Sequence, residues 1–257
     1  MIAPAPVSWR ALRAWQRNRD AFLRLWKTDA IPALAEPIVV LLIVSFGFGR
    51  IVEDVDGMPY RDYVGPGMLA AYTMFAPAFE NTWASYLRMA VQRTFDAMIV
   101  TPLSIEDVIA GEILWGMTRA LMHGIIILVA LAALGLVHSP LAALVIPLAL
   151  LQGLLMASLA MCVTAKAPSI NSFNYFWSLF LYPMFFLSGV FFPLHEFPAA
   201  LERLAWVLPM TSGVHIARNL VHGDLTLSML WAALGMAGGA LVLFNMALVL
   251  MRRRLIV

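Results

Sequence analysis

The sequence predicts an all-α polytopic membrane protein with six transmembrane helices. Of its 257 residues, 62% are apolar and only 12% are charged, whereas soluble domains average about 45–50% and about 25%. The mean hydropathy is +0.84. The apolar residues form six runs of about 18–25 residues, which suits membrane-spanning helices better than the short alternating strands of a membrane β-barrel.

The whole chain, residues 1–257, is expected to form a single transmembrane domain. An even number of spans puts both termini on one side of the membrane. With the termini inside, twelve Lys and Arg residues face the cytoplasm and four face outward, and the positive-inside rule favours that orientation. The expected spans are residues 31–48, 64–83, 113–137, 141–165, 173–192 and 227–251.

Residues 8–27 are expected to form an amphipathic helix in the cytoplasmic interface. Arginines alternate there with large apolar residues at mostly three- or four-residue intervals, which is typical of helices at headgroup depth. A simple basic flank is the alternative. Nucleic acid is not an expected partner, because the basic residues stop where a span begins. The apolar residues are Trp9, Leu12, Trp15, Phe22 and Trp26.

An outer segment, residues 193–226, separates the fifth and sixth spans. Pro193, Pro198 and Pro209 bound it, and Ala199–Leu208 has a helical pattern that includes Trp206. We expect a short helical re-entrant element here, between two membrane spans.

Motifs for catalysis are missing from the sequence. Neither Lys27 nor Lys166 lies in a G-x-x-x-x-G-K-[ST] phosphate loop. No H-E-x-x-H pair exists, and Cys162 is the sole cysteine, so a thiolate zinc site is excluded. The chain is therefore not expected to be an enzyme by itself, and no catalytic, cofactor or metal residues are predicted.

The connection between the second and third spans, residues 88–107, has an informative pattern. Residues 93–104 alternate charged and apolar side chains, as a short interfacial helix would. Thr101-Pro102 should end this helix, because the residue before proline disfavours the α conformation. Ser104, followed by Glu106 and Asp107, is expected to cap the next helix. A short projecting helix suits docking to a partner protein; an ordinary loop with a proline turn is the alternative.

This segment resembles the coupling segment of type-2 ABC exporter permeases. Three further stretches resemble that family in the same order: residues 63–68, 186–194 and 208–211. Residues 95–97, 101–104 and 110–116 are most similar to the nodulation-protein-J type, which is associated with lipo-chitooligosaccharide export. The residues that the resemblance assigns to ATPase coupling are Arg93, Thr94, Phe95, Asp96, Thr101, Pro102, Leu103 and Ser104.

The resemblance implies a permease subunit that exports an amphiphilic glycolipid or lipooligosaccharide. It implies two copies of a separate ABC ATPase, which would bind ATP and Mg, and a second permease copy, as a homodimer among membrane lipids. Asp96 would then meet a basic residue of the ATPase, and Phe95 would fill a pocket in it. An exporter of a small hydrophobic drug or antibiotic is one alternative. An ATPase-independent transporter or channel is another, although no inverted repeat or mid-membrane carboxylate is visible.

Four polar residues near or within the spans form a candidate charge network: Glu80, Glu112, Arg119 and His123. Arg119 and His123 share one helix face with Glu112. Because an unpaired charge in the bilayer is costly, we expect Arg119 to pair with Glu80 or Glu112. The network either holds helix ends together or contacts a substrate headgroup.

The fifth span is rich in aromatic residues. Packing and interface positions explain such residues in many membrane helices. The alternative is an aromatic lining along which sugar rings or acyl chains move. The candidates for this path are Tyr175, Trp177, Phe180, Tyr182, Phe185 and Phe186.

Overall fold

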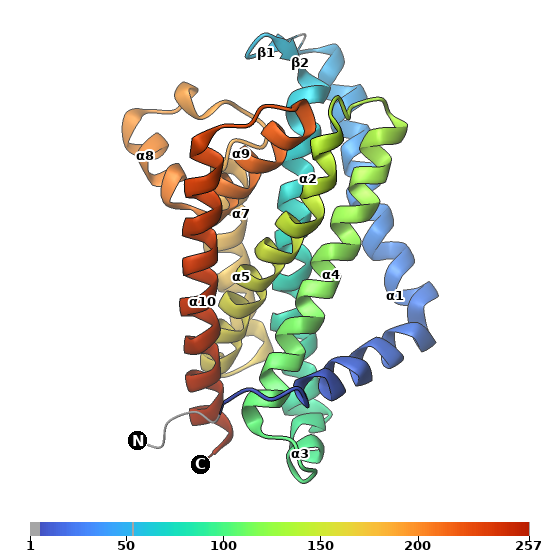
Figure 1. Ribbon diagram of the computed structural model, residues 1–257, viewed down its shortest axis with the longest axis vertical. Coiled ribbons are helices and arrows are strands. Elements are labelled where there is room, and N and C mark those ends of the chain that lie inside the picture. The colour runs from blue at the N-terminus through green and yellow to red at the C-terminus, as the bar shows by residue number, and fades with distance from the viewer. Residues whose placement is uncertain (1–5, 53, 257) are drawn as a thin grey trace.

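The computed structural model describes the backbone of residues 6–52 and 54–256, and their side chains except those of 29, 30, 32–34, 45 and 50. Long helices run side by side along the long axis (Figure 1). The two ends of the chain lie at one end of the bundle with α3 (Thr94–Ile99), and we call this the α3 end. The other end, the α8 end, carries β1 (Asp54–Val55), β2 (Met58–Pro59) and α8 (Ala199–Val207).

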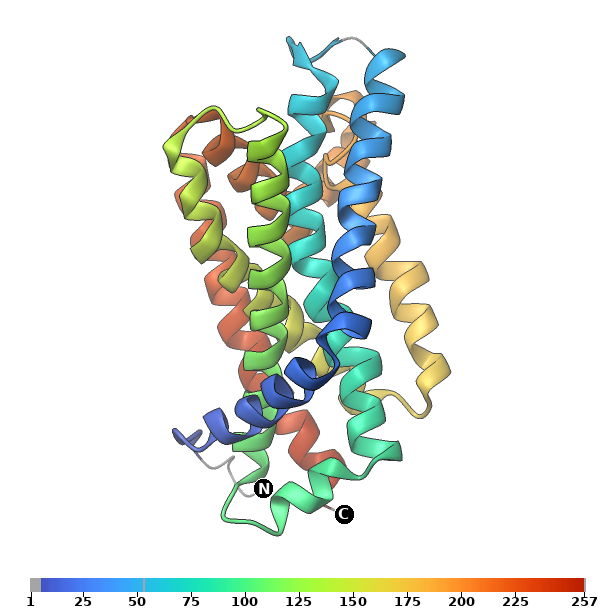
Figure 2. The same ribbon diagram turned by 90° about the vertical axis from the view of Figure 1, so that its right-hand side faces the viewer.

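Helix α1 (Ala11–Gly47) contains both the expected interfacial helix and the first expected span. It bends at Leu25, whose φ of −116° and ψ of 16° are not helical. The part before the bend lies obliquely across the bundle and the part after it runs along the bundle (Figure 2). A short 3₁₀ turn, Phe48–Arg50, leads to the antiparallel β1–β2 pair.

Helix α2 (Tyr60–Phe79) continues beyond its last α-helical residue, but with a different hydrogen-bonding pattern. It continues through two π-helical turns, Glu80–Ala84 and Leu87–Val91. Helix α4 (Ile105–Ala133) follows α3 and starts eight residues before the expected third span. The capping prediction for Ser104 is confirmed: its hydroxyl accepts from the Asp107 N–H at 3.0 Å, and the Asp107 carboxylate accepts from the Ser104 N–H at 3.2 Å.

The centre of the bundle is α5 (Val145–Lys166), which packs against α4 and α10 (Leu227–Leu255). Within the described residues, three helical stretches are long and apolar enough to cross a membrane: Ile105–Ala133, Pro140–Lys166 and Leu227–Leu255. The fifth expected span consists of shorter pieces, α6 (Phe173–Phe176), a π-helical turn Trp177–Leu181 and α7 (Tyr182–Leu187). The count of six spans remains a prediction.

The outer segment is helical, as expected for Ala199–Leu208, where α8 forms. The next helix, α9 (Pro209–His222), was not expected from the sequence, and it packs against α2 and α10. Gly213 lets α9 approach α5, since a Cβ atom there would lie 2.0 Å from the Gln152 side-chain nitrogen. The left-handed Gly223, with φ of 98°, ends α9.

Candidate functional site

The α3 helix presents one exposed face and one buried anchor. Phe95 is fully buried and belongs to an apolar cluster that includes Ile109 and Phe173. The expectation that Phe95 fills a pocket of a partner is therefore wrong, because this ring attaches α3 to its own bundle. The exposed residues recur at three- or four-residue intervals, which places them on one helix face. They are Arg93, Asp96, Ala97 and Val100, the last with 86% of its surface exposed.

The remaining candidate coupling residues hold the ends of α3. Arg93 precedes the helix in the left-handed conformation, with φ of 51°. At the other end, the Thr101 hydroxyl donates to the Met98 carbonyl at 2.6 Å. Pro102 is exposed, Leu103 is half-buried, and Ser104 caps α4. The predicted helix and its end at Thr101-Pro102 are both present.

The first part of α1 is hydrogen-bonded to both ends of this segment. Arg10 Nη1 donates to the Pro102 carbonyl at 2.7 Å, and Arg17 Nη2 lies 3.4 Å from the Thr94 hydroxyl. The backbone N–H of Ser8 donates to Asp107 Oδ1 at 2.7 Å. The expected interfacial helix is thus attached to α3 and to the start of α4.

Close backbone packing reinforces this attachment. A Cβ atom on Gly111 of α4 would lie 2.5 Å from Ala14 Cβ and 2.7 Å from the Ala11 carbonyl oxygen of α1. About two turns after Gly111 along α4, the Thr118 hydroxyl accepts a hydrogen bond from the Trp15 indole at 2.8 Å. Only glycine at position 111 permits this distance between the two helices.

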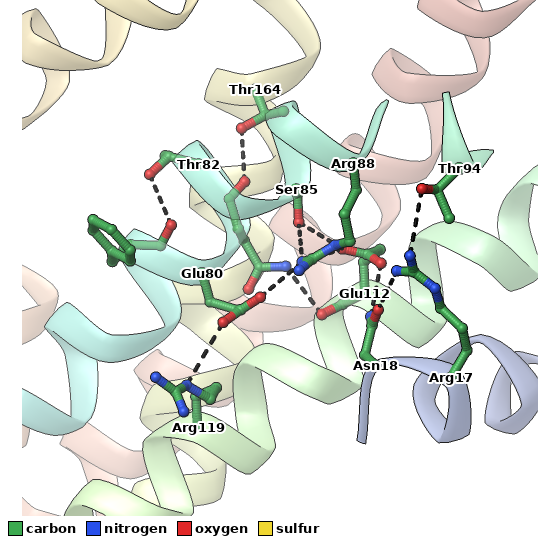
Figure 3. Close-up of polar contacts among 12 residues, drawn as sticks. Arg17, Asn18, Glu80, Thr82, Ser85, Arg88, Thr94, Glu112, Arg119 and Thr164 are labelled. Atoms are coloured by element: carbon green, nitrogen blue, oxygen red, sulfur yellow. Dashed lines mark hydrogen bonds and ion pairs between the residues drawn. The ribbon is translucent and has the colours of Figure 1, made fainter. Parts of the chain in front are cut away.

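A cluster of buried charges lies where α1, α2 and α4 meet (Figure 3). Arg88 Nη2 lies 2.7 Å from Glu112 Oε2 and 2.8 Å from Glu80 Oε1. Arg119 Nε lies 3.6 Å from Glu80 Oε2. Of the two expected pairings, Arg119 therefore takes Glu80, whereas Glu112, which is fully buried, pairs with Arg88.

Arg88 was not expected in this cluster, because the apolar runs place it in the cytoplasmic connection. In an uninterrupted α-helix, eight residues rotate a side chain by about 800°, which would leave Arg88 about 80° away from Glu80. The π-helical turn that starts at Glu80 contains one more residue than an α-helical turn. The rotation about the helix axis from Glu80 to Arg88 therefore equals that of seven α-helical residues, about 700°. The two side chains then lie within about 20° of each other.

Hydrogen bonds from three residues, on α1 and on the continuation of α2, complete the surroundings of Glu112. Its carboxylate accepts from Asn18 Nδ2 and from the Ser85 hydroxyl, each at 2.7 Å. Asn81 Nδ2 donates to the Glu112 carbonyl at 3.0 Å. A buried carboxylate is stable when it is paired and hydrogen-bonded in this way. His123 is also buried, and its Nδ1 lies 2.9 Å from the Arg119 carbonyl oxygen of the same helix.

A row of aromatic rings lies between α2 and the helical segment that contains α6 and α7. Two of the aromatic candidates, Trp177 and Phe185, belong to this row. Successive centroids are 5.0–5.8 Å apart. The α2 side of the row was missed, although Phe75, Phe79 and Trp83 recur every fourth position and Phe79 also contacts Trp83. The row runs through Phe173, Trp83, Trp177, Phe75, Phe185 and Phe191.

The other candidates lie beside this row. Tyr182 contacts Trp177 at 5.9 Å, and Phe186 contacts Phe185 at 5.3 Å between centroids. Tyr175 is exposed, whereas Phe180 stacks on Phe176 and also borders a largely apolar groove of about 740 Å³ next to α10. The structure therefore brings together Trp177, Tyr182, Phe185 and Phe186, but not Tyr175.

Comparisons with known proteins show the family to which the chain belongs. Residues 11–221 match the ABC-2 type transporter family. The chain is 33% identical to nodulation protein J of Rhizobium meliloti over 255 residues, 99% of this chain and 97% of that protein. It is 36% identical to nodulation protein J of Sinorhizobium fredii over 82% of this chain and 80% of that one. The inner membrane transport permease YadH of Escherichia coli is 24% identical over 79% of each chain. The protein therefore belongs to the ABC-2 transporter permeases, as a membrane component of a transport system.

Proposed function

We propose that this chain is the permease subunit of an ATP-driven exporter in a bacterial inner membrane. The domain would have six spans and both termini in the cytoplasm. The observation that carries the proposal is the exposed α3 face, which projects from one end of the bundle and is attached to three other elements. Phe95 anchors it in the core, and Arg10 and Arg17 connect its two ends to α1.

In this proposal, two copies of a separate ATPase bind ATP and Mg and dock on the α3 faces of a permease homodimer. Asp96, Ala97 and Val100 offer one charge and an apolar patch for such a contact. Movement of α3 would be transmitted to α4 through the packing of Phe95 and to α1 through the hydrogen bond of Arg10. The cluster of buried charges formed by Glu80, Arg88, Glu112 and Arg119, here called the Arg88 cluster, lies where α1, α2 and α4 meet. Those helices would therefore shift together.

We propose an amphiphilic glycolipid or lipooligosaccharide as the substrate. Two features support this class: stacked aromatic faces tolerate sugar rings and acyl chains, and the Trp177 indole N–H is buried without a hydrogen-bond partner in the described structure. The identity to the two nodulation J proteins supports the same class. A small hydrophobic drug is the alternative substrate, and it would use the same row of rings.

Reconstitution in liposomes tests the proposal. The purified chain should not hydrolyse ATP alone, and should stimulate hydrolysis and move a fluorescent glycolipid only when an ABC ATPase encoded beside its gene is present. Mass spectrometry of co-purified lipids identifies the substrate class. Transport by the chain without any ATPase would overturn the proposal and favour a secondary transporter or channel.

A further inference from the structure

Three potential metal ligands converge at the α8 end of the bundle, far from the α3 face. Asp62 lies in the first turn of α2, His138 in the connection between α4 and α5, and His222 in the last turn of α9. One side-chain ligand atom from each residue lies within 4.8 Å of the other two. His138 Nε2 is 2.7 Å from Asp62 Oδ1.

The orientation of the His222 ring suits a metal ligand. Its Nδ1 lies 2.8 Å from the Arg218 carbonyl oxygen, which can only accept a hydrogen bond. Nδ1 must therefore carry the proton when the ring is neutral, and Nε2 has a free lone pair. That Nε2 is buried and has no hydrogen-bond partner among the described residues. A backbone carbonyl that fixes the tautomer in this way is the usual support of a metal-binding histidine.

The backbone around these residues is fixed by close contacts. The His138 N–H donates to the Val221 carbonyl at 3.1 Å. A Cβ atom on Gly223 would lie 2.9 Å from Ser139 Cβ, so the glycine lets the connection reach the end of α9. The ligands are thus held close together before any ion binds.

We propose that Asp62, His138 and His222 form a zinc-binding site. Two imidazoles and one carboxylate, with water in the fourth position, are a common ligand set for tetrahedral Zn²⁺. Zinc bonds of about 2.0–2.1 Å put ligand atoms about 3.3 Å apart. Since the three ligand atoms lie within 4.8 Å of one another, no separation has to shorten by more than about 1.5 Å. The His138 side chain is 47% exposed, so its ring has room to move and the ion has a route from solvent.

Neighbouring charges are compatible with this site. Arg61 Nε lies 3.5 Å from Asp62 Oδ2, the carboxylate oxygen that does not contact His138. Asp62 Oδ1 is hydrogen-bonded to His138 Nε2, so zinc would take the place of this hydrogen bond, and the neutral His138 ring would then carry its proton on Nδ1. Bound zinc would connect α2, the α4–α5 connection and α9, and so would hold the α8 end in one arrangement. This inference does not depend on the proposed export function.

Zinc binding by the full chain in detergent tests the proposal. The protein carries an affinity tag without histidines, is stripped with EDTA, and is titrated with Zn²⁺ in competition with a chromophoric chelator. We expect one zinc per chain, and an affinity at least tenfold lower for His222→Gln and for His138→Gln. The control is His195→Gln at the same end of the bundle, which should bind like the wild type.

The two variants separate loss of a ligand from loss of the fold. His222 is packed against its neighbours, so its variant is also checked by size-exclusion chromatography, whereas the half-exposed His138 ring can be changed without opening a buried space. X-ray absorption at the zinc edge should show imidazole nitrogens at about 2.0–2.1 Å. A wild-type chain that retains no zinc, or a His138→Gln chain with wild-type affinity, would show that the proposed site is wrong.

Discussion

Arg88 Nη2 lies 2.7 Å from Glu112 Oε2, although 24 residues separate the two in the sequence. Arg88 comes from the π-helical continuation of α2, and Glu112 is fully buried on α4. The guanidinium also reaches Glu80, so one cation neutralises two carboxylates. This contact joins the π-helical continuation of α2 to α4.

Removing Arg88 should destabilise the protein strongly. Arg88→Met leaves the Glu112 carboxylate buried without its cation, and breaking a buried pair in this way costs about 3–5 kcal/mol. Thermal unfolding of the purified chain in detergent should show a clearly lower midpoint. Arg19→Met is the matched control, because the Arg19–Asp20 pair is exposed and such pairs contribute about 0–1 kcal/mol. Equal midpoints for the two variants would contradict the role assigned to Arg88.

Charge reversal at Asp96 should abolish coupling without affecting the fold. Asp96 is exposed, so Asp96→Arg changes only the surface that would meet the ATPase. We expect normal expression and dimerisation, with loss of transport and of transport-stimulated ATP hydrolysis. Asp224→Arg, an exposed change at the α8 end, should transport normally. Wild-type transport by Asp96→Arg would mean that α3 is an ordinary connection.

Phe95 should affect stability more than docking. Phe95→Ala removes a fully buried ring, and such substitutions cost about 3–5 kcal/mol. Limited proteolysis should then cut the chain near α3 in the permease alone, before any ATPase is added. Val100→Ala, on the exposed face, should leave the proteolysis pattern unchanged. If Phe95→Ala resisted protease like the wild type, the anchoring role would be disproved.

A single methyl group should separate α1 from α4. Gly111→Ala places Cβ too close to Ala14 and to the Ala11 carbonyl, so we expect α1 to shift and the thermal midpoint to fall. Gly238→Ala is the control, since nothing lies within 4 Å of its added Cβ and alanine favours a helix by up to about 1 kcal/mol. Its midpoint should stay equal or rise. A Gly111→Ala chain as stable as Gly238→Ala would contradict the close packing.

Cysteine labelling should determine the orientation. Cys162 is buried, so it should react little with a membrane-impermeant maleimide. In intact spheroplasts, Asp56→Cys at the α8 end should be labelled, and Val100→Cys on α3 should be labelled only after lysis. The opposite pattern would invert the orientation that the positive-inside rule predicts.

Local sequence signals were sufficient to predict many of the helices. The length of the apolar runs predicted the three long helices that contain residues 113–133, 145–165 and 227–251. The Trp and Arg spacing predicted a helix over residues 8–27, and Ser104 with Asp107 predicted the cap of α4. Each of these signals acts within a few turns of one helix, so the sequence alone reveals it.

The missed features depend on contacts between distant residues. The π-helical turns bring Arg88 onto the face of Glu80, and no pattern of hydrophobicity indicates such turns. Asn18 and Glu112 are 94 residues apart, so their hydrogen bond follows from the packing of α1 on α4. The burial of Phe95 has the same origin, because α3 folds back onto the start of α4.

The Arg88 cluster also bears on how the chain enters the bilayer during synthesis. Glu80 and Arg88 belong to α2 and its continuation, whereas Glu112 and Arg119 belong to α4, the next long helix to leave the ribosome. A charge that met lipid alone would cost up to about 2.5–3.5 kcal/mol, and pairing across the two helices removes most of that cost. In the predicted six-span arrangement, in which α2 and α4 both cross the membrane, release of α2 from the translocon would be most favourable once α4 has emerged, so that the two helices partition together as a hairpin.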